Sequence, residues 1–133
     1  MAPLSVLASR KKAATRLNRN SRLFKTIIKS IQEKKGEHIV SLDLRKIPEA
    51  VADFFVICEA SSNIQIGAIA EHIEEEVKQL LKESPYHHEG YLALQWVLID
   101  YVNIVVHIFL PSNRKFYQLE EMWSDGELVE HLD

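Results

Sequence analysis

The apolar run Phe54–Cys58 is the feature that most constrains the fold of this chain. A strand with one face in water alternates apolar and polar residues, whereas here consecutive side chains on both faces are apolar. Such a strand is expected where both faces of a β-sheet are covered by other elements. The run therefore predicts a buried strand over 53–60 in a sheet that has helices packed against it.

A helix is predicted on each side of this strand in the sequence. The first covers 21–35 and is followed by Gly36, a residue typical of helix ends. The second covers 63–83, and Pro85 follows it. Apolar residues recur at helical spacing in both segments and predict one buried stripe on each helix. The stripes contain Leu23, Phe24, Ile27, Ile28 and Ile31 in the first helix, and Ile66, Ile69, Ala70, Ile73, Val77, Leu80 and Leu81 in the second.

The turn before the second helix has two interpretations. Ser62 and Gln65 have the spacing of a capping box, in which each side chain bonds the other residue's backbone N–H. The pair Ser61-Ser62 after a strand is also compatible with a phosphate-binding turn. The capping interpretation requires no ligand and is the preferred one.

Three more strands are predicted, over 38–44, 94–101 and 104–110, and the last two form a hairpin. If Val102-Asn103 is a two-residue turn, Asp100 pairs with Val105, Leu98 with His107, and Trp96 with Phe109. These six side chains then share one face, and Asp100 lies diagonal to His107, within reach of a hydrogen bond. Val102 is a poor residue for such a turn, so the register depends on this assumption.

The C-terminal region is predicted to contain one short helix and a tail. Pro111 introduces the helix, and Phe116, Leu119 and Trp123 are spaced to seat it on the sheet. Gly126 ends it, and residues 126–133 are expected to form a mobile acidic tail. The central domain would then cover 21–125.

Charge is distributed unevenly along the chain. Residues 1–35 contain ten Lys or Arg and one acid, whereas residues 36–133 contain six Lys or Arg and eighteen Asp or Glu. An acidic body repels nucleic acid and attracts a basic protein surface, although such charge also serves solubility. The basic segment 1–20 is interpreted as a disordered terminus. A weak RNA contact and a transit peptide are the alternatives for this segment.

Candidate catalytic and metal-binding groups are sparse. Cys58 is the only cysteine, so no intramolecular disulfide forms, and it lies in a buried strand where thiols are usually inert. His72, His87, His88 and His107 lack the spacing of a paired-histidine metal motif, even with Glu89 nearby. An Asp100–His107 acid–base pair would lack a nucleophile. No catalytic residue, metal or cofactor is therefore predicted.

The hairpin is better explained as a docking surface. Tryptophan, tyrosine and charged groups around an apolar patch are the usual composition of an interface anchor. Trp96 begins its strand and is expected to be partly exposed, whereas Trp123 is expected in the core. No apolar run approaches the ~20 residues that a membrane-spanning helix needs.

Three groups of residues together resemble the ribosomal silencing factor family, also called Iojap, over about 24–123. The first is Lys35-Gly36 with Leu42-Asp43-Leu44, and the second is Asp53–Cys58 with Ser62 and Gln65. The third contains Glu89-Gly90, Trp96–Asp100, Val105–Phe109, Arg114, Phe116-Tyr117, Leu119-Glu120 and Trp123. Three departures stand out. Residues 1–20 have no counterpart in the family pattern, Val102 replaces a common turn glycine, and Glu59 replaces a small polar residue.

The resemblance implies a mixed sheet flanked by helices, similar to a nucleotidyltransferase core without its paired carboxylates. It implies binding to the large ribosomal subunit at the ribosomal protein numbered fourteen, where the bound factor blocks joining of the small subunit and represses translation when nutrients are scarce. Trp96 is carried over as a contact residue. Glu89, Asp100, His107, Tyr117 and Glu120 match further motif positions and are expected at the partner-binding surface.

Partners and alternatives follow from the same resemblance. Self-association of the free protein is expected, and no membrane contact. A bacterial cytoplasm is the expected location, with an organelle as the alternative. Two other functional classes stay open: a relic nucleotidyltransferase-like enzyme that uses Asp100 and His107, and an RNA-binding module that uses the basic segment 1–20.

Overall fold

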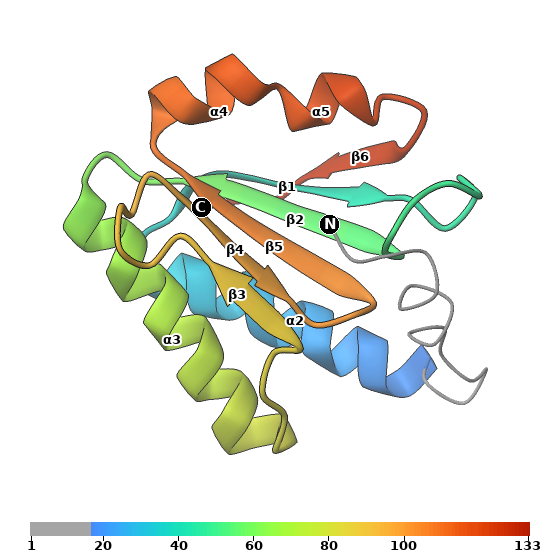
Figure 1. Cartoon of the computed structure of the whole chain (residues 1–133). Helices are drawn as coiled ribbons and strands as arrows, with labels where there is room; N and C mark the ends of the chain where they lie inside the picture. The colour runs from blue at the N-terminus through green and yellow to red at the C-terminus, as the bar shows by residue number, and fades with distance from the viewer. Residues whose placement is uncertain (1–16) are drawn as a thin grey trace.

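The computed structural model describes residues 17–133, with side chains from residue 21 onward. Within this part, a six-stranded mixed sheet lies between two pairs of helices (Figure 1). This arrangement confirms the predicted α/β class. The elements are α2 (Leu17–Glu33), β1 (Glu37–Asp43), β2 (Phe54–Glu59), α3 (Asn63–Leu81), β3 (His87–Glu89), β4 (Trp96–Asp100), β5 (Ile104–Phe109), α4 (Pro111–Tyr117), α5 (Leu119–Met122) and β6 (Glu127–Glu130).

The strand order is β3-β4-β5-β2-β1-β6, which places the apolar run in the interior of the sheet. β2 pairs with β5 in parallel and with β1 antiparallel. The four middle residues of β2 are buried. Each face of the sheet has its own hydrophobic core, so the prediction of a buried strand with both faces covered is confirmed.

α2 and α3 cover one face of the sheet, and in this core their predicted stripes pack against apolar side chains of the strands. Leu80 differs, since it is 55% exposed and lies beyond Val77, the last buried residue of α3. α2 begins at Leu17, four residues before the predicted start. The rest of the predicted N-terminal tail, residues 1–16, lies outside the described residues.

Ser62 caps α3 as predicted, because its side chain accepts a hydrogen bond from the Gln65 N–H at 3.2 Å. The other half of the capping box is absent. The Gln65 amide instead donates to the carbonyl oxygens of Lys34 and Lys35, at 3.3 and 3.0 Å. These carbonyls follow the end of α2, so Gln65 joins the two helices rather than closing its own cap.

The opposite face of the sheet is covered by α4, α5 and the loop after β1. The single predicted helix is divided in two at Gln118, whose φ of 48° is left-handed. Leu119 is buried and Trp123 packs edge-on against Phe55, both as predicted. Phe116 is 79% exposed, so the prediction that it seats the helix on the sheet is wrong.

The hairpin register agrees with the prediction at all three pairs: Trp96 with Phe109, Leu98 with His107, and Asp100 with Val105. Val102 adopts a positive φ of 77° in the turn. Its N–H donates to Asp100 Oδ1 at 2.7 Å, a local bond typical of aspartate in turns. This bond favours the turn although valine suits it poorly.

The C-terminal segment is not the mobile tail that was expected, because β6 pairs antiparallel with β1. β3, which was not predicted, pairs with β4 at the other edge. All residues of both strands are exposed. An edge strand that buries no side chain has no hydrophobic pattern to reveal it, which explains both errors. None of the described helices is long and apolar enough to cross a membrane.

Candidate docking surface

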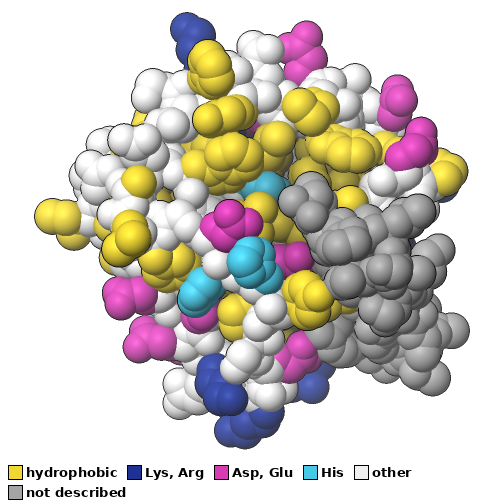
Figure 2. All heavy atoms as spheres, in the orientation of Figure 1, with side chains coloured by type: hydrophobic (Ala, Val, Ile, Leu, Met, Phe, Trp, Pro, Cys, Tyr) yellow, Lys and Arg dark blue, Asp and Glu magenta, His cyan; other side chains and the backbone are white. Residues whose placement is uncertain are grey.

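Most of the predicted site residues lie on β3, β4 and β5, on the face of the sheet opposite α2 and α3. Alternation along β4 sends Trp96, Leu98 and Asp100 to this face, and pairing places His107 beside Leu98. Glu89 of β3 lies opposite Leu98. Figure 2 shows hydrophobic side chains gathered where α4 and α5 cross the sheet, with histidine and acidic side chains below them.

Trp96 is half-buried and held on two sides by aromatic rings. Its ring stacks on Phe109, with centroids 5.0 Å apart, and lies 4.6 Å from the ring of Tyr117 on α4. Its Nε1–H donates to Nδ1 of His107 at 3.1 Å. The predicted partial exposure of Trp96 is therefore confirmed, and its orientation is fixed by three neighbours from two elements, β5 and α4.

His107 is buried, with 4% of its surface exposed. Its ring lies edge-on to Phe55, with centroids 4.7 Å apart. Burial lowers its pKa to about 3, so the ring is neutral at physiological pH. His107 therefore supports the surface from below and is not available to a partner.

The expected hydrogen bond between Asp100 and His107 is not formed. His107 Nδ1 accepts from Trp96, and Nε2 has no hydrogen-bond partner. The Asp100 carboxylate instead accepts the Val102 N–H, because this donor is local and needs a partner in the turn. The acid–base pair that an enzyme would require is thus not assembled.

Glu120, another predicted contact residue, takes part in an ion-pair cluster centred on Arg114. The guanidinium lies 2.8 Å from Glu120 and 3.1 Å from Glu59. It also donates to the His38 carbonyl oxygen at 2.7 Å. The Arg114 side chain is only 11% exposed, and it fixes α4 to the sheet through Glu59 and to α5 through Glu120. The sequence analysis assigned no role to Arg114. It treated Glu59 only as a departure from the family pattern, whereas the structure shows Glu59 as a partner of Arg114.

The exposed part of the surface differs from the predicted set. Glu89 is exposed and bonds His87 at 2.8 Å, and Tyr117 is 42% exposed. Phe116, whose ring meets that of Tyr117 edge-on, joins them as the most exposed aromatic residue. We call Glu89, Trp96, Leu98, Phe116 and Tyr117 the docking face. Adjacent residues of a helix point in different directions. Because Tyr117 packs on Trp96, Phe116 could have been expected to point into solvent.

Groups that could support other chemistry lie elsewhere. Cys58 is buried, and burial raises its thiol pKa to about 12, in line with the inert role predicted for it. His88 bonds Glu74 of α3 at 2.7 Å rather than joining His87 and Glu89. A cleft of about 450 Å³ beside β6 is lined by His38, Arg114 and His131, but the guanidinium there is already paired.

The fold and this surface define an α/β domain with an exposed aromatic cluster on one face of its sheet. Residues 18–133 match the model of a family described as ribosomal silencing factor during starvation. The chain belongs to this family, whose name links the family to the ribosome and to the regulation of translation.

Several relatives support this assignment. The chain is 36% identical to the ribosomal silencing factor RsfS of Halalkalibacterium halodurans, over 84% of this chain and 93% of that protein. It is 34% identical to the chloroplastic protein Iojap of Zea mays, over 79% of this chain and 45% of that protein. A crystal structure from Bacillus halodurans aligns with a TM-score of 0.72 and 32% identity, covering 84% of this chain and 99% of the other.

Proposed function

We propose that the chain binds the large ribosomal subunit through its docking face, at the ribosomal protein numbered fourteen, and blocks joining of the small subunit. Translation is thereby repressed when nutrients are scarce. The observation that carries the proposal is the exposed Phe116, which extends the aromatic cluster of Trp96 and Tyr117 into solvent. Exposed aromatic anchors of this kind supply much of the binding energy of protein interfaces.

Charge supports a basic protein as the partner. The six Lys or Arg and eighteen Asp or Glu of residues 36–133 make the body acidic, and Glu89 adds an exposed carboxylate to the docking face. Ribosomal proteins are basic because they neutralise RNA phosphates. Opposite charges on two surfaces accelerate encounter and favour the correct partner.

The mechanism requires no reaction. A domain bound at the surface where two subunits meet occupies space that the second subunit needs. Of the three other predicted contact residues, Asp100 and His107 are buried and shape the surface from beneath, and Glu120 is paired with Arg114. We place this activity in a bacterial cytoplasm, with an organelle as the alternative, and include self-association of the free protein through the same aromatic face.

Cosedimentation with purified ribosomal subunits tests the proposal. We expect binding to the large subunit and inhibition of subunit joining. Phe116→Ala and Trp96→Ala should each weaken binding by more than ~1 kcal/mol, or about fivefold. Leu132→Ala is the matched control, since this side chain is 87% exposed beyond β6, at the other edge of the sheet. Wild-type affinity in both aromatic variants would refute the proposed surface.

The RNA-binding alternative makes a different prediction. If the basic N-terminal segment led the interaction, deleting residues 1–16 would abolish binding to the large subunit. If the docking face leads, the deletion should leave most of the affinity. Because α2 begins at Leu17, this deletion removes no residue of the described helix.

A further inference from the structure

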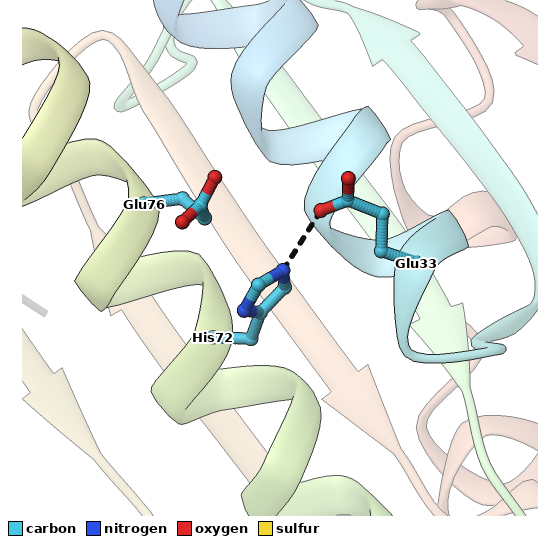
Figure 3. A group of neighbouring side chains, drawn as sticks. All are labelled: Glu33, His72 and Glu76. Atoms are coloured by element: carbon cyan, nitrogen blue, oxygen red, sulfur yellow. Dashed lines mark hydrogen bonds and ion pairs between the residues drawn. The ribbon is translucent and has the colours of Figure 1, made fainter.

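Three potential metal ligands meet on the helical side of the sheet, opposite the docking face. Glu33 is the last residue of α2, and His72 and Glu76 lie one turn apart on α3. Figure 3 shows their side chains pointing toward one another from the two helices. His72 Nε2 lies 2.8 Å from Glu33 Oε1, and all three ligand atoms are within 4.8 Å of one another.

The charges of this group are only partly balanced by its neighbours, because Lys29 and Lys34 act on Glu33. Glu33 accepts a hydrogen bond from His72, which lowers the pKa of the glutamate and keeps it ionised. Glu76 is partly buried, and its carboxylate forms no hydrogen bond or ion pair with the described residues. Two carboxylates held this close repel each other unless a cation lies between them.

We propose that Glu33, His72 and Glu76 bind a divalent transition-metal cation of the zinc type. Zinc takes four ligands from histidine nitrogen and carboxylate oxygen, and water would fill the fourth position. An imidazole ligand favours zinc over magnesium or calcium, which prefer oxygen alone. The observed spread of 4.8 Å is wider than a closed tetrahedral site, and rotation of the glutamate side chains brings the oxygens inward.

The fold gives this site a defined physical consequence. Glu33 belongs to α2, whereas His72 and Glu76 belong to α3, so a bound ion joins two helices that pack side by side on the sheet. An ion that binds only the folded chain stabilises it. The docking face lies on the other side of the sheet, so occupancy is not expected to alter ribosome binding.

A second histidine–glutamate pair offers an internal control. His88 bonds Glu74 at 2.7 Å between β3 and α3, in the same way as His72 bonds Glu33. Among the described residues, no third metal ligand joins that pair. If a simple histidine–carboxylate contact sufficed for zinc, the two pairs would behave alike.

Zinc titration of the chelator-treated full chain, followed by calorimetry, tests the proposal. We expect one zinc per chain and a higher unfolding midpoint on addition of zinc. His72→Ala and Glu76→Gln should each weaken binding by at least about tenfold, because even residues that only orient ligands have effects of this size. His88→Ala should bind as the wild type does. The proposal is overturned if the wild type shows no saturable binding, or if Glu76→Gln retains full affinity.

Discussion

The indole Nε1–H of Trp96 donates a hydrogen bond to Nδ1 of His107 across the β4–β5 pair, over 3.1 Å. The bond requires that Nδ1 carry no proton, so the proton of the neutral ring is on Nε2, which has no partner. Burial of the ring lowers its pKa to about 3. The central residue of the docking face is thus oriented by a histidine that stays uncharged.

This arrangement predicts that the domain loses stability in mild acid. The pKa of His107 is about 3 in the folded chain and near 6.5 in the unfolded chain. Below pH 6.5 the unfolded state binds a proton that the folded state does not, so stability falls as the pH decreases toward 3. Between pH 7 and pH 5 the His107 contribution to the free energy of unfolding should decrease by about 2 kcal/mol. Urea denaturation at the two pH values measures it.

The matched variant is His107→Gln, whose amide oxygen can still accept the Trp96 N–H but does not titrate. We expect the variant to lose less stability than the wild type between pH 7 and pH 5. Burial also lowers the pKa of His131, which acts in the same direction and is retained in both proteins. An equal loss in the two proteins would show that His107 is not the titrating group.

The interior of the fold was predictable because its residues carry a hydrophobic pattern. The buried run of β2 and the stripes of α2 and α3 follow from the spacing of apolar side chains. The hairpin register also follows, since a slip by one residue would have turned Trp96 and Leu98 to the other face. Each of these elements is specified by what it buries.

The periphery of the fold was not predictable in the same way. β3 and β6 are held by backbone hydrogen bonds and bury no side chain, so their sequences resemble loops. The cluster of Glu59, Arg114 and Glu120 joins residues up to 61 positions apart, which no local pattern encodes. The division of the predicted helix into α4 and α5 occurs at Gln118, and neither glycine nor proline marks the break.

Gly90 is predicted to be indispensable for the position of Trp96. Its φ of +93° is unfavourable for other residues, and a Cβ atom there would lie 2.0 Å from the Trp96 carbonyl oxygen. Gly90→Ala should therefore lower the free energy of unfolding by about 2 kcal/mol or more, and weaken binding to the large subunit. Chemical denaturation and cosedimentation measure the two effects.

Gly67 provides the comparison for this substitution. It lies within α3, and an added Cβ would make an ordinary contact of 3.4 Å with Leu94. Gly67→Ala should be neutral or stabilise the domain by up to about 1 kcal/mol, because alanine favours helix. If both variants were equally unstable, the clash at Trp96 would not explain the requirement for Gly90.

Arg114 is predicted to hold α4, and with it Phe116 and Tyr117, in place. Replacement by alanine would leave the carboxylates of Glu59 and Glu120 without their shared cation in a site where the guanidinium is 11% exposed. Breaking such a shielded pair from one side costs about 3 kcal/mol. Arg114→Lys should recover only part of this, because lysine cannot form the same set of directed bonds. Urea unfolding curves that coincide with the wild type would contradict the role of Arg114.

Cys58 provides a final test, because the rate at which it reacts shows whether its thiol is accessible to reagents in the folded protein. The side chain is fully buried in β2, and burial raises its pKa from 9.0 to about 12. At a given pH below 9, this shift reduces the thiolate fraction about a thousandfold, and access is blocked as well. Labelling with a thiol reagent should therefore be slow in the native protein, fast in urea, and limited under native conditions by opening of the sheet. Fast labelling of the native chain would mean that β2 is not the enclosed strand on which the fold depends, and would reopen a catalytic role for Cys58.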